Sequence, residues 1–321
     1  MIGFNKETTI NITMIGASGV GKTTLLTSMY NEFNRDFSYG NHLKLTADED
    51  TQMKLDKKLS MLVSQINDDD IVMTPQLEGT DKVEEFKFVL SRHIKSKERL
   101  NLLFRDFPGG YLKTQRNKVR EIIEKSQIIL IPIDTSALME EQSRFNELVN
   151  NTNSILEMYQ DLTSLFERRE RLIIFVPLKS EKSLYAKENI FEIFEKKYQG
   201  ILDFFDGDTV RKKNSVIFTP IKTLGSIFFS KIDDSNKQIP KFVYKARVAN
   251  PQYLPENCDQ PLRYIVSFAL KQDMQNKSFW NRFNSKKIDN ETLETSFKKY
   301  LDSCRRDEQF KILLNRDLLL N

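Results

Sequence analysis

The sequence predicts an α/β fold built on a doubly wound, mostly parallel sheet. Short apolar segments bounded by polar turns have the composition of buried strands, and segments with helical periodicity lie between them. Such alternation of strands and helices is typical of a parallel sheet that is covered by helices on both faces. The predicted strands of this sheet are residues 10–15, 100–105, 127–133, 171–176 and 215–219.

Helical periodicity marks the segments between these strands. Apolar residues at helical spacing predict a short helix after Gly110, one long helix over residues 141–169, and another over 190–201. The same pattern predicts helices over residues 261–270 and 288–304 near the end of the chain. The first three helices alternate with the strands in the order that a doubly wound sheet requires.

Three segments interrupt this alternation. Residues 48–66, rich in Asp, Lys, Met and Leu, predict an inserted helix. Residues 83–91 alternate apolar and polar side chains and are separated from residues 100–105 by a short polar loop, so we expect these two strands to pair antiparallel. Residues 226–250 contain two apolar runs around a polar turn, which predicts a β-hairpin insertion.

The domain organisation follows from the same patterns. The chain of 321 residues shows no internal repeat and no linker rich in Gly, Pro or Ser. We therefore expect one elaborated domain over residues 1–270, which includes the helical insertion and the hairpin insertion. A C-terminal helical extension, residues 271–321, is expected to pack on it.

Composition and charge exclude several classes of protein. Apolar residues make up 39% of the chain and charged residues 29%, a balance typical of a folded soluble domain. The net charge of +4 is small and dispersed, so we expect no nucleic-acid partner. No apolar run approaches the roughly 18 residues of a transmembrane helix, and the N-terminus lacks the apolar core of a signal peptide. These features predict a cytoplasmic protein.

The strongest motif lies directly after the first predicted strand. Residues 16–23 read Gly-Ala-Ser-Gly-Val-Gly-Lys-Thr, which is a complete phosphate-binding loop (P-loop, Walker A) pattern, and a helical pattern follows. Glycines allow the loop to turn its amide groups toward phosphate oxygens at the positive end of the next helix. The residues predicted to bind a nucleoside triphosphate are Gly16, Ser18, Gly19, Val20, Gly21, Lys22, Thr23 and Thr24.

A carboxylate at the end of a second buried strand completes the predicted phosphate site. Lys22 is expected to neutralise the β- and γ-phosphates, and the hydroxyl of Thr23 to bind Mg²⁺. Asp106 ends the strand at 100–105 and begins the sequence Asp-Phe-Pro-Gly-Gly, a DxxG pattern. Asp106 is therefore a candidate Mg²⁺ ligand. Gly109 is a catalytic candidate because its amide can approach the γ-phosphate with no side chain in the way.

These motifs, in this order, resemble the TRAFAC class of GTPases, which includes Ras-type switches. The Asp-Phe-Pro-Gly-Gly form and the long insertions are similar to prokaryotic double-GTPase-type (DO-GTPase) proteins of conflict systems. The resemblance covers roughly residues 10–225. It implies a P-loop NTPase fold of the Ras-like G-domain type, with GTP as ligand, Mg²⁺, hydrolysis of the γ-phosphate and a nucleotide-dependent molecular switch.

The resemblance also implies a threonine whose hydroxyl reaches Mg²⁺ and whose backbone senses the γ-phosphate. Residues 68–81 offer Thr74 and Thr80 just before the strand at 83–91. Thr74 is favoured as a metal ligand and catalytic residue because Thr-Pro is a stiff, extended pair. Thr80 stays open as the alternative.

A candidate base-binding motif follows the strand at 171–176. Residues 177–181 read Pro-Leu-Lys-Ser-Glu, where the family carries Asn/Thr-Lys-x-Asp. Lys179 is expected to lay its aliphatic stem on the base. Glu181 is expected to accept hydrogen bonds from the N1–H and amino group of guanine, an edge that adenine lacks. Because Leu178 and Glu181 depart from the family pattern, an ATP-dependent ATPase or kinase stays open as an alternative.

The catalytic strength expected from the sequence is low. Ras-type enzymes orient the attacking water with a glutamine directly after the DxxG glycine, whereas this chain has Gly110 and Tyr111 there, with Gln115 one helical turn further on. We expect slow intrinsic GTP hydrolysis, assisted by a protein partner that supplies the missing group. A protein effector is also expected, and nucleotide-driven dimerisation and a nucleotide-stabilised scaffold without turnover stay open.

Overall fold

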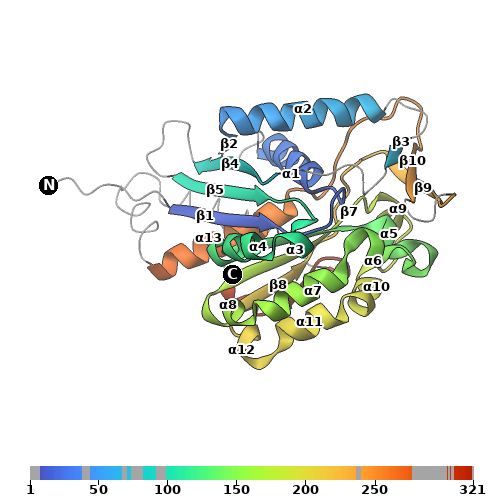
Figure 1. Cartoon of the computed structure of the whole chain (residues 1–321). Helices are drawn as coiled ribbons and strands as arrows, with labels where there is room; N and C mark the ends of the chain where they lie inside the picture. The colour runs from blue at the N-terminus through green and yellow to red at the C-terminus, as the bar shows by residue number, and fades with distance from the viewer. Residues whose placement is uncertain are drawn as a thin grey trace.

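Two sheets organise the computed structural model, which describes residues 8–37, 44–66, 71–73, 82–91, 99–235, 240–276, 302, 304 and 307–319. The large sheet has eight strands, and the small one has three (Figure 1). The strands of the large sheet are β1 (Thr8–Met14), β2 (Lys44–Ala47), β4 (Glu84–Ser91), β5 (Arg99–Asp106), β6 (Ile128–Asp134), β7 (Arg171–Leu178), β8 (Asn214–Phe218) and β11 (Lys311–Leu314).

The order of strands in the large sheet is β11-β8-β7-β6-β1-β5-β4-β2. The five central strands from β8 to β5 run parallel, whereas β4 pairs antiparallel with β5 and β2 antiparallel with β4. All five predicted strands of the parallel sheet and the antiparallel strand at 83–91 are present. The prediction of a doubly wound, mostly parallel α/β fold is confirmed.

Helices cover both faces of this sheet and bury its apolar side chains. On one face, α1 (Lys22–Phe37) and α13 (Gln260–Asn276) contribute to a continuous apolar core. A second core on the other face includes residues of α4 (Arg116–Lys125), α7 (Thr152–Asp161) and α10 (Ile190–Lys197). Every residue of β6 and β7 is buried, as expected for strands covered on both sides.

The remaining helices are short connections, apart from one long insertion. That insertion is α2 (Glu49–Ile66), which lies between β2 and the small sheet. The short elements are α3 (Tyr111–Thr114), α5 (Thr135–Met139), η1 (Glu140–Ser143), α6 (Asn146–Asn150), α8 (Thr163–Arg168), α9 (Glu181–Tyr185), α11 (Gln199–Asp206), α12 (Asp208–Arg211) and η2 (Arg316–Leu318). No helix in the described ranges combines the length and hydrophobicity needed to cross a bilayer.

The small sheet joins two insertions that are far apart in the sequence. The predicted hairpin is formed by β9 (Ile227–Asp233) and β10 (Lys241–Ala246), and β10 also pairs antiparallel with β3 (Ile71–Met73). The order in the sheet is therefore β3-β10-β9. The predicted helical insertion at 48–66 and hairpin insertion at 226–250 are both confirmed, and the strand that follows α2 contacts the hairpin.

The prediction of a single long helix over residues 141–169 is wrong. The segment is divided into η1, α6, α7 and α8. Asn151 adopts a left-handed conformation with φ of 55° between α6 and α7, and Glu141 and Gln142 also have positive φ. These conformations stop the helix while the side chains keep the apolar periodicity that suggested a continuous one.

The C-terminal part of the chain contributes a strand that the sequence reading did not predict. In β11, residues Lys311–Leu314 pair antiparallel with β8 at the edge of the large sheet. Apart from residues 302 and 304, the helix predicted over 288–304 lies outside the described residues. The division of the chain at residue 270 stays a prediction, and α13 continues past that position to Asn276.

Candidate functional site

The P-loop connects the buried end of β1 to the first turn of α1. Gly19 and Gly21 have φ values of 75° and 112°, a region that residues with a side chain rarely adopt. A Cβ atom at Gly21 would also lie 3.0 Å from Cδ1 of Leu178, at the end of β7. The local sequence thus permits a tight loop whose backbone lies at the carboxyl edge of the parallel strands, where α/β sheets bind ligands.

Lys22 bends back over this loop. Its Nζ donates hydrogen bonds to the backbone oxygens of Gly16, at 3.3 Å, and Ala17, at 3.1 Å. The same atom lies 3.6 Å from Oδ1 of Asp106, and only 5% of the Lys22 side chain is exposed. The ammonium group is therefore held between the loop and the end of β5, facing the space that the loop encloses.

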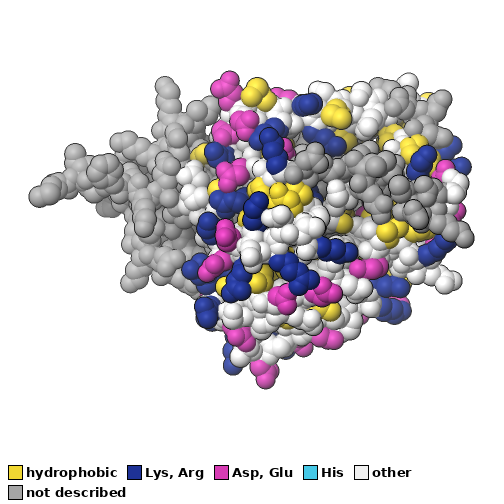
Figure 2. Space-filling view, in the orientation of Figure 1, with side chains coloured by type: hydrophobic (Ala, Val, Ile, Leu, Met, Phe, Trp, Pro, Cys, Tyr) yellow, Lys and Arg dark blue, Asp and Glu magenta, His cyan; other side chains and the backbone are white. Residues whose placement is uncertain are grey.

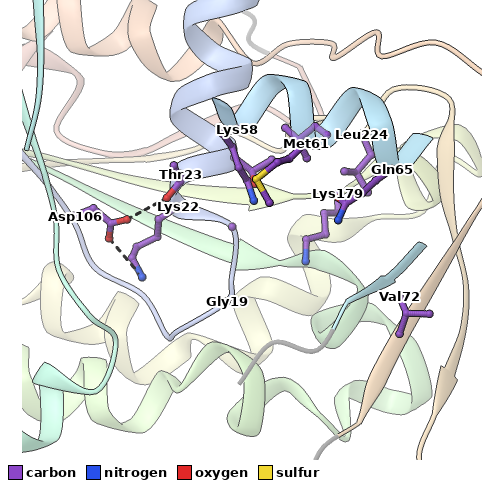
Figure 3. Close-up of a pocket in the computed structure, with 13 residues that line it drawn as sticks. Gly19, Lys22, Thr23, Lys58, Met61, Gln65, Val72, Asp106, Lys179 and Leu224 are labelled. Carbon is purple, nitrogen blue, oxygen red and sulfur yellow. Dashed lines mark hydrogen bonds and ion pairs between the residues drawn. The ribbon is translucent and has the colours of Figure 1, made fainter. Parts of the chain in front are cut away.

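Asp106 reaches the loop because the two strands are in register. β1 and β5 are parallel neighbours, and Met14 is the register partner of Asp106, so both strands end at the same level. Oδ2 of Asp106 accepts a hydrogen bond from Oγ1 of Thr23 at 3.5 Å, which Figure 3 shows together with the contact to Lys22. Burial raises the pKa of Asp106 to about 6, although the nearby Lys22 ammonium opposes this shift.

The donor set around Asp106 fits a magnesium ion. Oδ1 of Asp106 is buried without a hydrogen-bond partner, and the Thr23 hydroxyl lies beside the same carboxylate. Among the described residues no cluster of three His, Cys, Asp or Glu side chains is present. One carboxylate and one hydroxyl are a small set of oxygen ligands, which suits Mg²⁺ because this ion takes its other ligands from phosphates and water.

Gly109 lies directly against the P-loop. A Cβ atom at this position would lie 2.3 Å from the backbone nitrogen of Ser18 and 2.5 Å from the carbonyl carbon of Ala17. Phe107, two residues earlier, is fully buried in the core that includes α4, α7 and α10, and this burial fixes the position of the segment. Only a glycine allows this approach of two backbones, so the DxxG segment and the P-loop are in contact through main-chain atoms.

A cavity of about 390 Å³ opens between the P-loop and α2 (Figure 3). Of the predicted site residues, Gly19, Gly21, Lys22, Thr23, Thr24, Asp106 and Lys179 line it. Gly16, Ser18, Val20, Gly109 and Glu181 are not among its lining residues. Val20 is fully buried and belongs to the support of the loop. The structure thus brings seven of the predicted site residues to one cavity.

Lys179 marks the end of this cavity opposite Asp106. It has a left-handed backbone, with φ of 57°, and a buried side chain. Its Nζ forms an ion pair with Oδ2 of Asp134 at 2.5 Å, and Asp134 also caps α5 through the amide of Ala137. The Nζ atom also lies 5.7 Å from the ring centre of Tyr244 on β10. Lys179 therefore connects the predicted base-binding loop to the hairpin insertion.

Glu181 joins this loop to the segment after β8. Its Oε1 accepts hydrogen bonds from the amides of Leu224, at 2.5 Å, and Gly225, at 3.2 Å. The side chain is 1% exposed, and burial raises its pKa to about 7 although the two amides favour the charged form. Leu224 itself lines the cavity. The contact of Glu181 with guanine stays a prediction; in this structure Glu181 positions a cavity-lining residue.

Several predicted residues lie elsewhere. Thr74 and Thr80 are outside the described residues, and the last described residue before them, Met73, ends β3. Gln115 is exposed at the start of α4 and does not line the cavity. Thr223 accepts a hydrogen bond from the amide of Lys179 at 3.2 Å, so the loop after β8 also supports the predicted base motif.

The inserted helix α2 supplies cavity residues that the sequence reading missed. These α2 residues are Lys58, Met61, Leu62 and Gln65; Val72 of β3 and Leu224, after β8, also line the cavity and were not predicted. The four α2 positions follow helical spacing and lie on one face, a signal present in the sequence. That signal identifies a face of the helix but not what the face covers.

The mostly parallel large sheet, together with the P-loop that follows β1, defines a P-loop nucleotide-binding protein. The family model Double-GTPase 2 matches residues 10–212, so the chain belongs to the Double-GTPase 2 family and is a GTP-binding P-loop protein. The resemblance to DO-GTPases inferred from the motifs is confirmed.

Among solved structures, the chain is similar to the bacterial selenocysteine-specific elongation factor EF-Sec, with 12% sequence identity over 68% of this chain and a TM-score of 0.33. It spans 26% of that protein's chain. No curated protein matches the sequence.

Proposed function

We propose that this protein is a guanine-nucleotide switch that binds GTP with Mg²⁺ and hydrolyses the γ-phosphate slowly. The observation that carries the proposal is the arrangement of Lys22, Thr23 and Asp106 around one cavity next to the P-loop backbone. Membership of a GTPase family supports GTP as the nucleotide. In this reading, the loop amides and the Lys22 ammonium bind the phosphates.

Thr23 and Asp106, with Thr74 as the third candidate, would hold the magnesium ion. When bound, Mg²⁺ neutralises negative charge on the phosphate oxygens that it contacts. Asp106 must be ionised to act as a ligand, and burial opposes this by raising its pKa to about 6. Lys22 lies 3.6 Å from Asp106 and helps to keep the carboxylate charged.

Slow hydrolysis is supported by the residues after the DxxG glycine. Gly110 has no side chain, Tyr111 is not among the cavity residues, and Gln115 is exposed outside the cavity. Orientation of the attacking water is a large part of catalysis in phosphoryl transfer. A protein partner that inserts an arginine or glutamine would therefore accelerate turnover.

The output of the proposed switch is a change in affinity for a protein effector. Gly109 contacts the P-loop backbone so closely that a γ-phosphate bound there would act directly on the segment that leads into α3. Among the described residues on the face seen in Figure 2, positive and negative side chains are interspersed, which suits a protein partner better than nucleic acid.

A calorimetric titration with GTP, GDP and ATP in the presence of Mg²⁺ tests the nucleotide. We expect the guanine nucleotides to bind more tightly than ATP. ATP is the rival because the Oε1 atom of Glu181 is engaged by two backbone amides. Tighter binding of ATP would overturn the guanine assignment. Release of phosphate at many turnovers per second by the protein alone would overturn slow hydrolysis.

A further inference from the structure

The inserted helix α2 carries a lysine on the face that it turns toward the protein. Its buried residues are Thr51, Leu55, Leu62 and Ile66, which repeat at helical spacing along one stripe. Lys58 occupies the next position of this stripe, three residues after Leu55 and four before Leu62. Lys58 is half-buried there and lines the cavity, so a charged side chain stands where the apolar stripe would otherwise continue.

Lys58 lies in the same cavity as the P-loop. Figure 3 shows its side chain extending from α2 into the cavity on the side of Thr23, whereas Gln65 lies near Leu224 and Lys179 at the other end. Seven residues of α-helix span about 10 Å. The α2 face therefore follows the cavity from the phosphate side toward the predicted base side.

The charges around the cavity favour an anion beside Lys58. Three lysines and one carboxylate line it. Lys22 and Lys179 pair with Asp106 and Asp134, but within the described parts of the chain Lys58 has no carboxylate at ion-pair distance. Lys54, one turn earlier on α2, instead pairs with Asp50 at 2.7 Å. An excess of positive charge around a concave site attracts a multiply charged anion.

We propose that Lys58 binds a phosphate group of the nucleotide. In this proposal α2 forms the wall of the nucleotide site opposite the P-loop, in addition to the P-loop and the end of β5. This inference rests on the proposed function and adds a phosphate-binding residue that lies outside the recognised motifs. Lys58 would supply a second ammonium group beside Lys22. The protein would then carry within its own chain part of the positive charge that phosphoryl transfer requires.

The test compares Lys58→Ala with the adjacent Lys57→Ala. Lys57 is exposed on the same helix and does not line the cavity, so its loss removes the same net charge without a phosphate contact. With Mg²⁺, we expect Lys58→Ala to bind GTP about tenfold more weakly, since one charge-assisted hydrogen bond is lost. Lys57→Ala should stay within about twofold of the wild type, and Lys58→Arg should retain most of the affinity.

Melting temperatures measured without nucleotide establish that both alanine variants are folded. Unchanged GTP affinity in Lys58→Ala, or an equal loss in Lys57→Ala, would overturn the role of Lys58 and leave the proposed function standing. If instead the wild-type protein binds neither GTP nor GDP with Mg²⁺, the proposed function fails first. The wild-type titration therefore separates the two failures.

Discussion

The two ends of the cavity are constructed in different ways. At the phosphate end, the contacts of Lys22 with Gly16 and Ala17 join residues within one short loop, and Asp106 arrives from the neighbouring parallel strand. At the predicted base end, Glu181 accepts hydrogen bonds from the amides of Leu224 and Gly225, more than forty residues further along the chain. The first end is therefore one short loop joined by a carboxylate from the adjacent strand, whereas the second end is two separate loops held together by a buried side chain.

This difference determines which residues can be replaced at each end of the cavity. A phosphate is recognised by backbone amides, an ammonium and a metal ligand, and these depend on a fixed spacing of residue types. The base end depends on side chains that hold backbone segments together, and the hairpin adds Tyr244 behind Lys179. If Leu-Lys-Ser-Glu is the base-binding motif, its departure from Asn/Thr-Lys-x-Asp is compatible with loops that are held in place by Thr223 and Glu181.

Loss of the ammonium at the phosphate end should have the largest effect. We expect Lys22→Ala to weaken binding of GTP by about 100-fold, because the ammonium that we propose to bind the β- and γ-phosphates is removed from a buried site. The folded state should persist, since the hydrogen bonds of Lys22 lie within its own loop and Asp106, which loses its cation, can take up a proton. Isothermal titration measures the affinity, with Lys57→Ala as the surface control. Undiminished affinity for every nucleotide would contradict the whole assignment of the site.

The contact between the DxxG segment and the P-loop gives the next largest effect. Gly109→Ala places a Cβ atom 2.3 Å from the Ser18 nitrogen, so one of the two backbones must shift. We expect a loss of about 2 kcal/mol in the free energy of unfolding without nucleotide. Denaturant unfolding followed by circular dichroism measures it.

Gly110→Ala is the matched control for this substitution. A Cβ atom at Gly110 would meet nothing within 4 Å, and its φ of −62° suits any residue. This variant should therefore unfold with a free energy close to that of the wild type. Equal stability of the two alanine variants would show that Gly109 does not lie against the loop in solution.

The phosphate end and the parallel sheet could be predicted from the sequence because their determinants are local. The apolar runs specify strands that are buried on both faces, and the P-loop pattern specifies a strand-loop-helix unit. The position of Asp106 followed from the end of a buried strand. These features depend on periodicity and on short spacing, and both can be read without knowing which segments meet.

The remaining features depend on contacts between distant segments. The pairing of β3 with β10 joins residues about 170 positions apart, and the sequence of neither strand indicates which strand it pairs with. The position of α2 beside the cavity also depends on tertiary packing. The sequence alone therefore did not distinguish Lys58 from the other lysines of the chain. The break at Asn151 was hidden because the residues around it keep a helical apolar pattern.

The smallest predicted effect tests the base end through the titration of Glu181. Burial raises the pKa of Glu181 to about 7 in the folded state, above its usual value of about 4.5. The folded protein therefore binds more protons than the unfolded chain between these values, and the stability that comes from this group is lost as pH rises through 7. Glu181→Gln removes the titration.

The stability of Glu181→Gln relative to the wild type should increase by about 1.4 kcal/mol between roughly pH 6 and pH 8. Denaturant unfolding at both pH values measures this difference. Asp106, whose pKa is also raised, is common to both proteins and cancels. Glu195→Gln, an exposed site on α10, is the control for the loss of one carboxylate. A flat difference for Glu181→Gln would mean that the carboxylate is solvated and that the 224–225 turn is held by other contacts.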